Sequence, residues 1–388
     1  MELKQRVAAR RELIVKLRRD LHRIPETAYT EEKTSAYVAA FLETLNLPLQ
    51  TGIARFGVLA TLDTGRNGPC LLIRADMDAL PVTEETGLPF ASEHPGSMHA
   101  CGHDAHMAML MGTAAVLREL QDELCGVIKF VFQPAEEGPG GAKPMIEAGV
   151  MENPTVDYTL GCHVWPDVPE GTIGVKAGPL MAAMDRFDLK IIGRGGHGAM
   201  PHQCVDALEI GCQVVGALQR IASRQMNPLT PTVVTVGSFH AGSAFNVIAP
   251  EAEMCGTTRT FEREVWQSWH QRLDRIVSGV CSAMGADYEL RFSPGYPPTI
   301  NDAGISEVVR RCAAAVVGAE NVVEPQPTMG GEDMSFFLER APGCYFCLGA
   351  GREGGAPIHN PRFDFNEDIM CNGVETFCRA ALELLARK

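Results

Sequence analysis

Three short apolar runs, each followed by a cluster of polar residues, constrain the fold of this chain most strongly. They span residues 71–73, 127–132 and 158–164, and a helical pattern after Asp104 separates the first two. Apolar strands that alternate with helices are typical of a sheet covered on both faces. Such sheets bind ligands at the carboxyl ends of their strands, where the polar clusters lie here. The pattern therefore predicts an α/β domain with a site at that edge.

The pattern changes near Asp185, where apolar and charged residues begin to alternate as in a strand with one solvated face. Helical patterns near 205–223 and 264–284 are interleaved with strand patterns near 186–191, 232–239, 252–260 and 288–292. This βαββαβ order is that of the ferredoxin-like split-βαβ sandwich. We therefore predict that a second, smaller domain is inserted into the α/β domain.

The chain length agrees with two domains, because a single core for 388 residues would be unusual. After Pro297-Pro298 the α/β pattern resumes with helices, a strand near 345–348 and a C-terminal helix. The predicted organisation is an α/β domain in two parts, residues 1–183 and 296–388, with residues 184–295 inserted.

Charge and cysteine content exclude several classes of protein. The net charge of -14 argues against nucleic acid as a partner, because phosphate binding needs a basic face. No apolar run reaches the roughly 18 residues of a membrane span, and the charged first residues do not resemble a secretion signal. The 13 cysteines then indicate free thiols in a reducing cytoplasm.

Cys101, His103, Glu136 and Glu137 offer the groups that a water-activating metal site needs. A thiolate and imidazole can hold an ion, while one of two adjacent carboxylates binds it and the other moves protons. A buried thiol and a solvated pair of glutamates are the plain alternatives. The polar residues around Cys101 favour the metal site, because unpaired polar groups are costly in a core. Asp78 is a candidate to orient a ligand imidazole.

Two further histidines lie at comparable positions. His163 is predicted to end a strand, and His359 lies in a loop rich in glycine and proline. Either histidine alone would more often have a structural role. They are candidate ligands because they occur together with the Cys, His and Glu residues at other strand ends or loops. Two G-x-G-x-x-G matches, at 193–198 and 349–354, lack the strand and helix of a dinucleotide site, so we reject a Rossmann interpretation.

These motifs together resemble the M20 metallopeptidases of subfamily D. This subfamily comprises amidohydrolases such as hippurate hydrolase, N-acyl-amino-acid amidohydrolases, N-acetyldiaminopimelate deacetylase and plant auxin-conjugate hydrolases. The resemblance covers nearly the whole chain and rests on segments 21–26, 74–81, 98–104, 132–137, 195–198, 246–250 and 329–333. One difference is Gly198, where alanine is more usual.

The resemblance implies a role for individual residues. Two divalent ions, zinc, manganese, cobalt or nickel, would be held by Cys101, His103, Glu137, His163 and His359. Glu136 would be the general base and acid that serves a metal-bridged hydroxide. The inserted domain would act as a lid and mediate dimerisation, in a homodimer or a dimer of dimers, and His197 would reach the partner's active site. Asn246, Arg259 and Gly330 would contact substrate, with Arg259 at its carboxylate.

The expected activity is hydrolysis of N-acyl-L-amino acids to a carboxylate and a free amino acid. A small-peptide or aminoacyl-conjugate hydrolase, such as a dipeptidase or carboxypeptidase, uses the same chemistry and stays open as an alternative. A non-catalytic binding dimer is disfavoured by the complete ligand set. A thiol enzyme with Cys101 as nucleophile is disfavoured because His103 is only two residues away on the same segment. Methionines at 107, 109 and 111 fit a core better than an acyl pocket.

Overall fold

A computed structural model describes residues 2–386 of the chain and divides it into two compact units. Unit 1 comprises the residues up to 178, residues 300–326 and the residues from 333 onward. Unit 2 comprises residues 179–299 and 327–332. Within the described residues, no helix combines the length and apolar character needed to cross a membrane.

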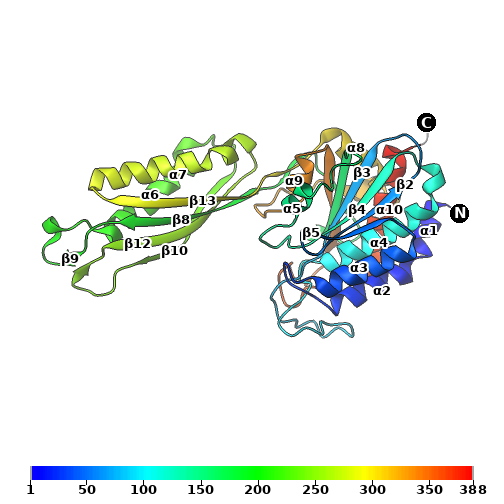
Figure 1. Cartoon of the computed structure of the whole chain (residues 1–388), viewed down its shortest axis with the longest axis horizontal. Coiled ribbons are helices and arrows are strands. Elements are labelled where there is room, and N and C mark those ends of the chain that lie inside the picture. The colour runs from blue at the N-terminus through cyan, green and yellow to red at the C-terminus, as the bar shows by residue number, and fades with distance from the viewer. Residues whose placement is uncertain (1, 387–388) are drawn as a thin grey trace. The chain divides into compact units, whose positions relative to one another are not determined.

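Unit 1 is built on an eight-stranded mixed sheet (Figure 1). The central neighbours β4, β3, β5 and β16 run parallel to one another, whereas β1, β2 and β6 pair antiparallel at the flanks. In order across the sheet, the strands are β1 (Leu49–Ile53), β2 (Gly57–Asp63), β4 (Val127–Gln133), β3 (Cys70–Asp76), β5 (Tyr158–Pro169), β16 (Gly343–Gly351), β6 (Ile173–Gly174) and β15 (Val322–Val323).

Most helices of unit 1 pack against one another in a connected layer, and the short α5 and α9 contact each other. The helices are α1 (Leu3–Ala8), α2 (Arg11–His22), α3 (Glu32–Thr44), α4 (His103–Glu119), α5 (Ala142–Glu147), α8 (Ala303–Val317), α9 (Ser335–Leu338) and α10 (Met370–Leu384). Helix α4 is buried along nearly its whole length, and Met107, Met109 and Met111 are part of the hydrophobic core. The prediction that these methionines serve the core is confirmed.

Unit 2 is a four-stranded antiparallel sheet in the order β10-β12-β8-β13 (Figure 1). This order, with helices after the first and third strands, is the predicted ferredoxin-like βαββαβ topology. The elements are β8 (Ala183–Ile192), β9 (Gly196–His197), α6 (Ala207–Arg220), β10 (Thr232–Ala241), β11 (Val247–Ile248), β12 (Glu251–Thr260), α7 (Arg263–Met284) and β13 (Asp287–Tyr296). The short strands β7 (Gly178–Met181) and β14 (Thr299–Asn301) lie where the chain passes between the two units.

Local sequence explains the ends of both helices of unit 2. The Asp206 side chain accepts from the amides of Leu208 and Glu209 and so caps the start of α6. Helix α7 ends at Gly285, whose φ of 73° is the left-handed conformation that favours glycine at a helix end. The apolar faces of both helices then pack on β8 and β12 in a core separate from that of unit 1.

Two sequence expectations about unit 1 need correction. The strand predicted to end at His163 continues to Pro169, so that prediction is wrong. It extends because β16 pairs with β5 past His163, although β3 pairs with β5 only as far as Gly161. The strand predicted over residues 71–73 also runs on through Asp76, which places charged residues inside a buried strand.

Candidate metal centre

The predicted ligands of unit 1 come together from four parts of its sequence. Cys101 and His103 flank the start of α4, Glu137 follows β4, His163 lies in β5, and His359 lies in the loop after β16. Three overlapping groups have ligand atoms that all lie within 4.8 Å of one another: Cys101, His103 and His163; Cys101, Glu137 and His359; and His103, Glu136 and Glu137. Two of these groups share Cys101, which suits adjacent ion sites.

Gly102 allows the side chains of Cys101 and His103, on either side of it, to face the same cluster. Its φ of 87° is a left-handed conformation that side-chain-bearing residues rarely adopt. Glycine is therefore the residue that lets the backbone turn between Cys101 and His103.

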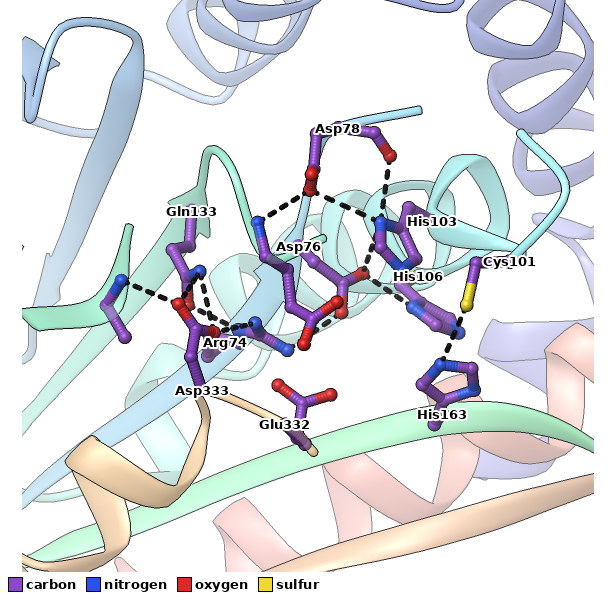
Figure 2. Close-up of polar contacts among 12 residues, drawn as sticks. Arg74, Asp76, Asp78, Cys101, His103, His106, Gln133, His163, Glu332 and Asp333 are labelled. Atoms are coloured by element: carbon purple, nitrogen blue, oxygen red, sulfur yellow. Dashed lines mark hydrogen bonds and ion pairs between the residues drawn. The ribbon is translucent and has the colours of Figure 1, made fainter. Parts of the chain in front are cut away.

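Backbone carbonyls set the tautomers of the two buried histidines among the candidate ligands. His103 Nδ1 donates to the carbonyl oxygen of Asp78 at 2.8 Å (Figure 2). His163 Nδ1 donates to the carbonyl oxygen of Val164 at 2.7 Å. A carbonyl oxygen only accepts, so Nδ1 carries a proton in both rings. Each Nε2 is left for the cluster, and that of His163 lies 3.4 Å from Cys101 Sγ.

Asp78 contacts the cluster through both its backbone and its side chain. Its backbone carbonyl orients His103, while its carboxylate accepts from the amides of Glu136 and Glu137, each at 2.9 Å. The carboxylate itself lies 3.5 Å from His103 Nδ1. Asp78 therefore fixes one imidazole and both glutamates relative to one another.

Glu31 holds the same loop one residue earlier, and sequence reasoning missed it. Its buried Oε1 accepts from the amide of Ala135 at 2.8 Å. Ala135 has a φ of 59°, a conformation that is unfavourable for alanine and needs support. Burial raises the pKa of Glu31 to about 7. Three successive amides, from Ala135 to Glu137, are thus held by two carboxylates from distant segments.

Sequence reasoning also missed a buried ion-pair network around Arg74, next to the candidate ligands. Arg74 donates to Asp76, Gln133 and Asp333, each at 2.8 Å, and all four side chains are buried (Figure 2). Asp333 also accepts from the amides at the start of α5. The signal in the sequence was the presence of two charges in an otherwise apolar strand, since buried charges need partners.

The surroundings of Cys101 suit a metal ligand better than a nucleophile. Burial raises the pKa of its thiol well above the usual range, and the carboxylates of Glu137 and Glu136 add to this effect. A nucleophilic cysteine needs the opposite shift. Burial also lowers the pKa of His163 well below its usual range, which keeps that imidazole neutral and able to coordinate.

The donor set fits a divalent transition metal. Thiolate, imidazole and carboxylate are ligands for zinc, and imidazole and carboxylate also suit manganese, cobalt or nickel. His103 Nε2 is buried and has no hydrogen-bond partner within residues 2–386; Glu137 Oε1 lies 3.9 Å from it. Such a buried atom is explained by a ligand that occupies the cluster.

The remaining predicted site residues belong to unit 2. His197 in β9 pairs with Val247 in β11, and the adjacent Gly198 amide donates to the carbonyl oxygen of Asn246 at 2.8 Å. The His197 ring is exposed and accepts from the amide of Ala199. The segments of His197 and Asn246 are thus neighbours within this unit.

Arg259 lies beside the segment that contains Gly330. Its Nε donates to the carbonyl oxygen of Met329 at 3.2 Å, and its Nη1 donates to Thr258 O and Thr257 Oγ1. Burial lowers the pKa of this guanidinium. The carboxylate of Asp185 opposes this shift, and within residues 2–386 no hydrogen bond from Nη2 is found. Its Nη2 group is therefore available to an anionic ligand.

Comparison with known proteins agrees with this geometry. Residues 72–383 match the model of peptidase family M20/M25/M40. An N-acyl-L-amino acid amidohydrolase of Geobacillus stearothermophilus is 48% identical over 77% of this chain and 81% of its own length. Thermostable carboxypeptidase 1 of Saccharolobus solfataricus is 39% identical over 96% of this chain and 95% of its own length.

A solved structure is similar to this chain over nearly its whole length. The YXEP protein of Bacillus subtilis, described as a dinuclear metal-binding peptidase from the M20 family, superposes with a TM-score of 0.86 at 36% identity. The match covers 97% of this chain and 99% of that one. On the family match and these relatives, the chain belongs to peptidase family M20/M25/M40.

Proposed function

We propose that this protein is a metal-dependent amidohydrolase that cleaves N-acyl-L-amino acids to a carboxylate and a free amino acid. The observation that carries the proposal is the convergence of thiol, imidazole and carboxylate groups on one buried cluster with Glu136 beside it. The relative named N-acyl-L-amino acid amidohydrolase supports the choice of substrate class.

Cys101, His103, Glu137, His163 and His359 would hold two divalent ions of zinc, manganese, cobalt or nickel. The overlapping ligand groups around the shared Cys101 support a pair of adjacent ions. When bound, such ions polarise an amide carbonyl and lower the pKa of a water molecule.

Glu136 would be the general base and acid. Its amide is held by Asp78, and its side chain belongs to the group that also contains His103 and Glu137. Glu136 takes one proton from the attacking water and then delivers it to the leaving amine as the carbon–nitrogen bond breaks. The products are a free amine and a carboxylic acid, which loses its proton to become a carboxylate at neutral pH.

Arg259 would recognise the carboxylate of the amino-acid part of the substrate. Three oxygens of unit 2 fix its guanidinium, its charge is half-buried, and its Nη2 group has no partner within the described residues. A substrate carboxylate would compensate that charge through charge-assisted hydrogen bonds. Gly330 and Asn246 would line the same substrate.

His197 would act on the substrate bound by a partner subunit, in a homodimer or dimer of dimers with unit 2 as the dimerising lid. Its exposed ring and the exposed apolar side chains of Met200, Phe245 and Val247 support a role at a contact between copies.

Mixing inactive His197→Ala subunits with inactive Glu136→Gln subunits should restore turnover, because mixed dimers regain one intact site. A mixture that stays inactive would show that His197 acts within its own chain. His202→Ala, an exposed neighbouring histidine, is the matched control and should remain active.

The test of the proposed reaction compares hippurate, N-acetyl-L-methionine and N-methylbenzamide with chelator-treated protein to which each metal is returned. Hippurate and N-methylbenzamide share the benzamide group, but the second lacks the carboxylate. We expect metal-dependent release of amino acid and little hydrolysis of N-methylbenzamide. Equal rates on both benzamides would reject the role of Arg259, and no hydrolysis with any metal would reject the reaction.

A small-peptide or aminoacyl-conjugate hydrolase is the second candidate. The relative named thermostable carboxypeptidase 1, whose match covers 96% of this chain, favours it. Adding dipeptides and N-blocked peptides to the same panel separates the two, since a peptidase would release amino acids from them faster than from N-acetyl-L-methionine.

We also infer a cytoplasmic location for the protein. All 13 cysteines are free thiols, which persist in a reducing compartment. Fractionation of the source cells would test this inference, and recovery in an oxidising compartment would contradict it.

A further inference from the structure

We propose that His106 is a positioning residue that holds His163 in place for metal binding, through the backbone amide of Val164. His106 is itself held by Asp76 and Arg74. The inference rests on the proposed function, since it takes His163 to be a ligand. His106 lies one turn after His103 in α4 and is buried.

The protonation of the His106 ring follows from its two partners. The amide of Val164 points at Nε2 at 2.9 Å, and an amide can only donate. Nε2 therefore carries no proton, and Nδ1 carries the one proton of a neutral ring. That proton is donated to Asp76 Oδ1 at 2.6 Å. Although His106 lies close to Asp76 and His103, both of its nitrogens are used, so it is not a metal ligand.

Asp76 is anchored on the side away from His106. Its Oδ2 accepts from Arg74 Nη1 at 2.8 Å, and Arg74 is held in turn by Gln133 and Asp333 (Figure 2). Because these side chains are buried and paired, Asp76 presents Oδ1 to His106 in a fixed direction.

The amide of Val164 has this side-chain partner because the sheet has a gap at that point. Strand β3 pairs with β5 only as far as Gly161. On the β3 side of β5, no strand therefore offers a carbonyl oxygen to the amide of Val164. His106 Nε2 supplies the hydrogen-bond acceptor that a paired strand would otherwise provide.

His106 influences the position of His163 through a backbone hydrogen bond and through direct ring packing. The amide that His106 fixes is the peptide bond between His163 and Val164, and the carbonyl of Val164 accepts from His163 Nδ1 at 2.7 Å. The two rings also pack at a centroid distance of 4.6 Å. Loss of the Nε2 hydrogen bond should therefore free the backbone that orients His163 Nε2 toward Cys101.

The two hydrogen bonds of His106 can be removed separately. In His106→Gln the amide oxygen can take the position of Nε2 and keep the bond from Val164. In His106→Asn the amide group can take the position of Nδ1 and keep only the bond to Asp76. His106→Ala keeps neither, and His270→Ala, at an exposed position in α7, is the control.

The measurement is cobalt binding to metal-free protein, by competition with a chelator and by the thiolate-to-cobalt absorption band. His163→Ala first identifies the binding step that depends on His163. We expect His106→Asn and His106→Ala to weaken that step by roughly 10–100-fold, the usual effect of removing a group that orients a ligand. His106→Gln should stay close to the wild-type protein, with the absorption band preserved.

Nitrogen NMR of histidine-labelled, metal-free protein gives a second readout that does not depend on activity. We expect a neutral His106 ring with its proton on Nδ1. A proton on Nε2, an Asn variant that binds cobalt more tightly than the Gln variant, or unchanged binding by both would overturn the inference. If the Ala variant fails to fold, the Gln and Asn pair still decides. A wild-type protein with no His163-dependent step would instead reject the proposed metal site, and this inference with it.

Discussion

Replacing His22 by glutamine should destabilise the protein in a pH-dependent way. His22 is buried at the end of α2, where Nδ1 donates to Asp104 at 2.8 Å and Nε2 donates to Glu84 at 3.3 Å. Both partners are carboxylates, so both nitrogens must carry protons and the ring is a cation. Burial would lower its pKa, but the carboxylates of Asp104 and Glu84 outweigh burial and raise it to about 9.

The size of the effect follows from the difference between the folded and unfolded values of that pKa. A rise from 6.5 to about 9 corresponds to about 3 kcal/mol of unfolding free energy, at about 1.4 kcal/mol for each pH unit. Because the folded pKa is raised, this stability is fully present below pH 6.5 and is lost as pH rises through about 9. The glutamine in the His22→Gln variant carries no charge, so the variant lacks this contribution to the unfolding free energy.

Guanidinium unfolding in the presence of a chelator, from pH 6 to pH 10, measures the prediction. The unfolding free energy of His22→Gln should lie about 3 kcal/mol below that of the wild-type protein at pH 6, and the gap should narrow above pH 9. Groups that titrate in both proteins cancel in this difference. His270→Gln, at an exposed position, should show no gap. A gap of the same size at pH 6 and pH 10 would refute a charged His22.

Three further predictions concern the site. Glu136→Gln should retain both metal ions by elemental analysis but lose turnover, and an active variant would reject the base assignment. Glu31→Ala should lower kcat by roughly 10–100-fold because Ala135 loses the acceptor that holds its amide, whereas Glu31→Gln keeps an acceptor oxygen and Glu32→Ala should be unaffected. Arg259→Lys should raise KM for hippurate with metal content unchanged, because an ammonium group does not reproduce a guanidinium fork; an unchanged KM would place the carboxylate elsewhere.

The sequence predicted the fold because its patterns are local. Apolar strands, helix periods and the change in alternation near Asp185 can each be recognised within about ten to twenty residues, and the structure confirms the α/β and βαββαβ architectures. The strand end predicted at His163 was wrong because strand length depends on the neighbour. Pairing with β16 continues to Pro169, and no pattern within residues 158–164 reveals this.

Support for the site depended on contacts that are distant in sequence. Arg74 and Asp333 are 259 residues apart, and Glu31 and Ala135 are 104 apart. Motifs reveal residues that chemistry requires in a short segment, such as Cys101 and His103. A carboxylate that holds a backbone amide leaves no such pattern, because an amide exists at almost every position. The sequence showed that β3 contains charged residues, but it did not show which residues they contact.

Three histidines of unit 1 show why residue type alone does not assign a role. His22 faces two carboxylates and must donate from both nitrogens, so it is a cation. His106 faces a carboxylate and a backbone amide, so one nitrogen donates, the other accepts, and the ring is neutral with no lone pair to spare. His103 donates to a carbonyl and has no hydrogen-bond partner for Nε2 within the described residues, so of these three rings it alone has a nitrogen left for a metal ion. Burial would lower its pKa, but the carboxylates of Asp76 and Asp78 outweigh burial and raise it to about 10, so metal binding there would release a proton. His103 and His106 share one helix turn and one sequence motif, but the groups that face their nitrogens differ, so that His103 keeps a nitrogen for the proposed metal ion and His106 has the role proposed for it of holding His163.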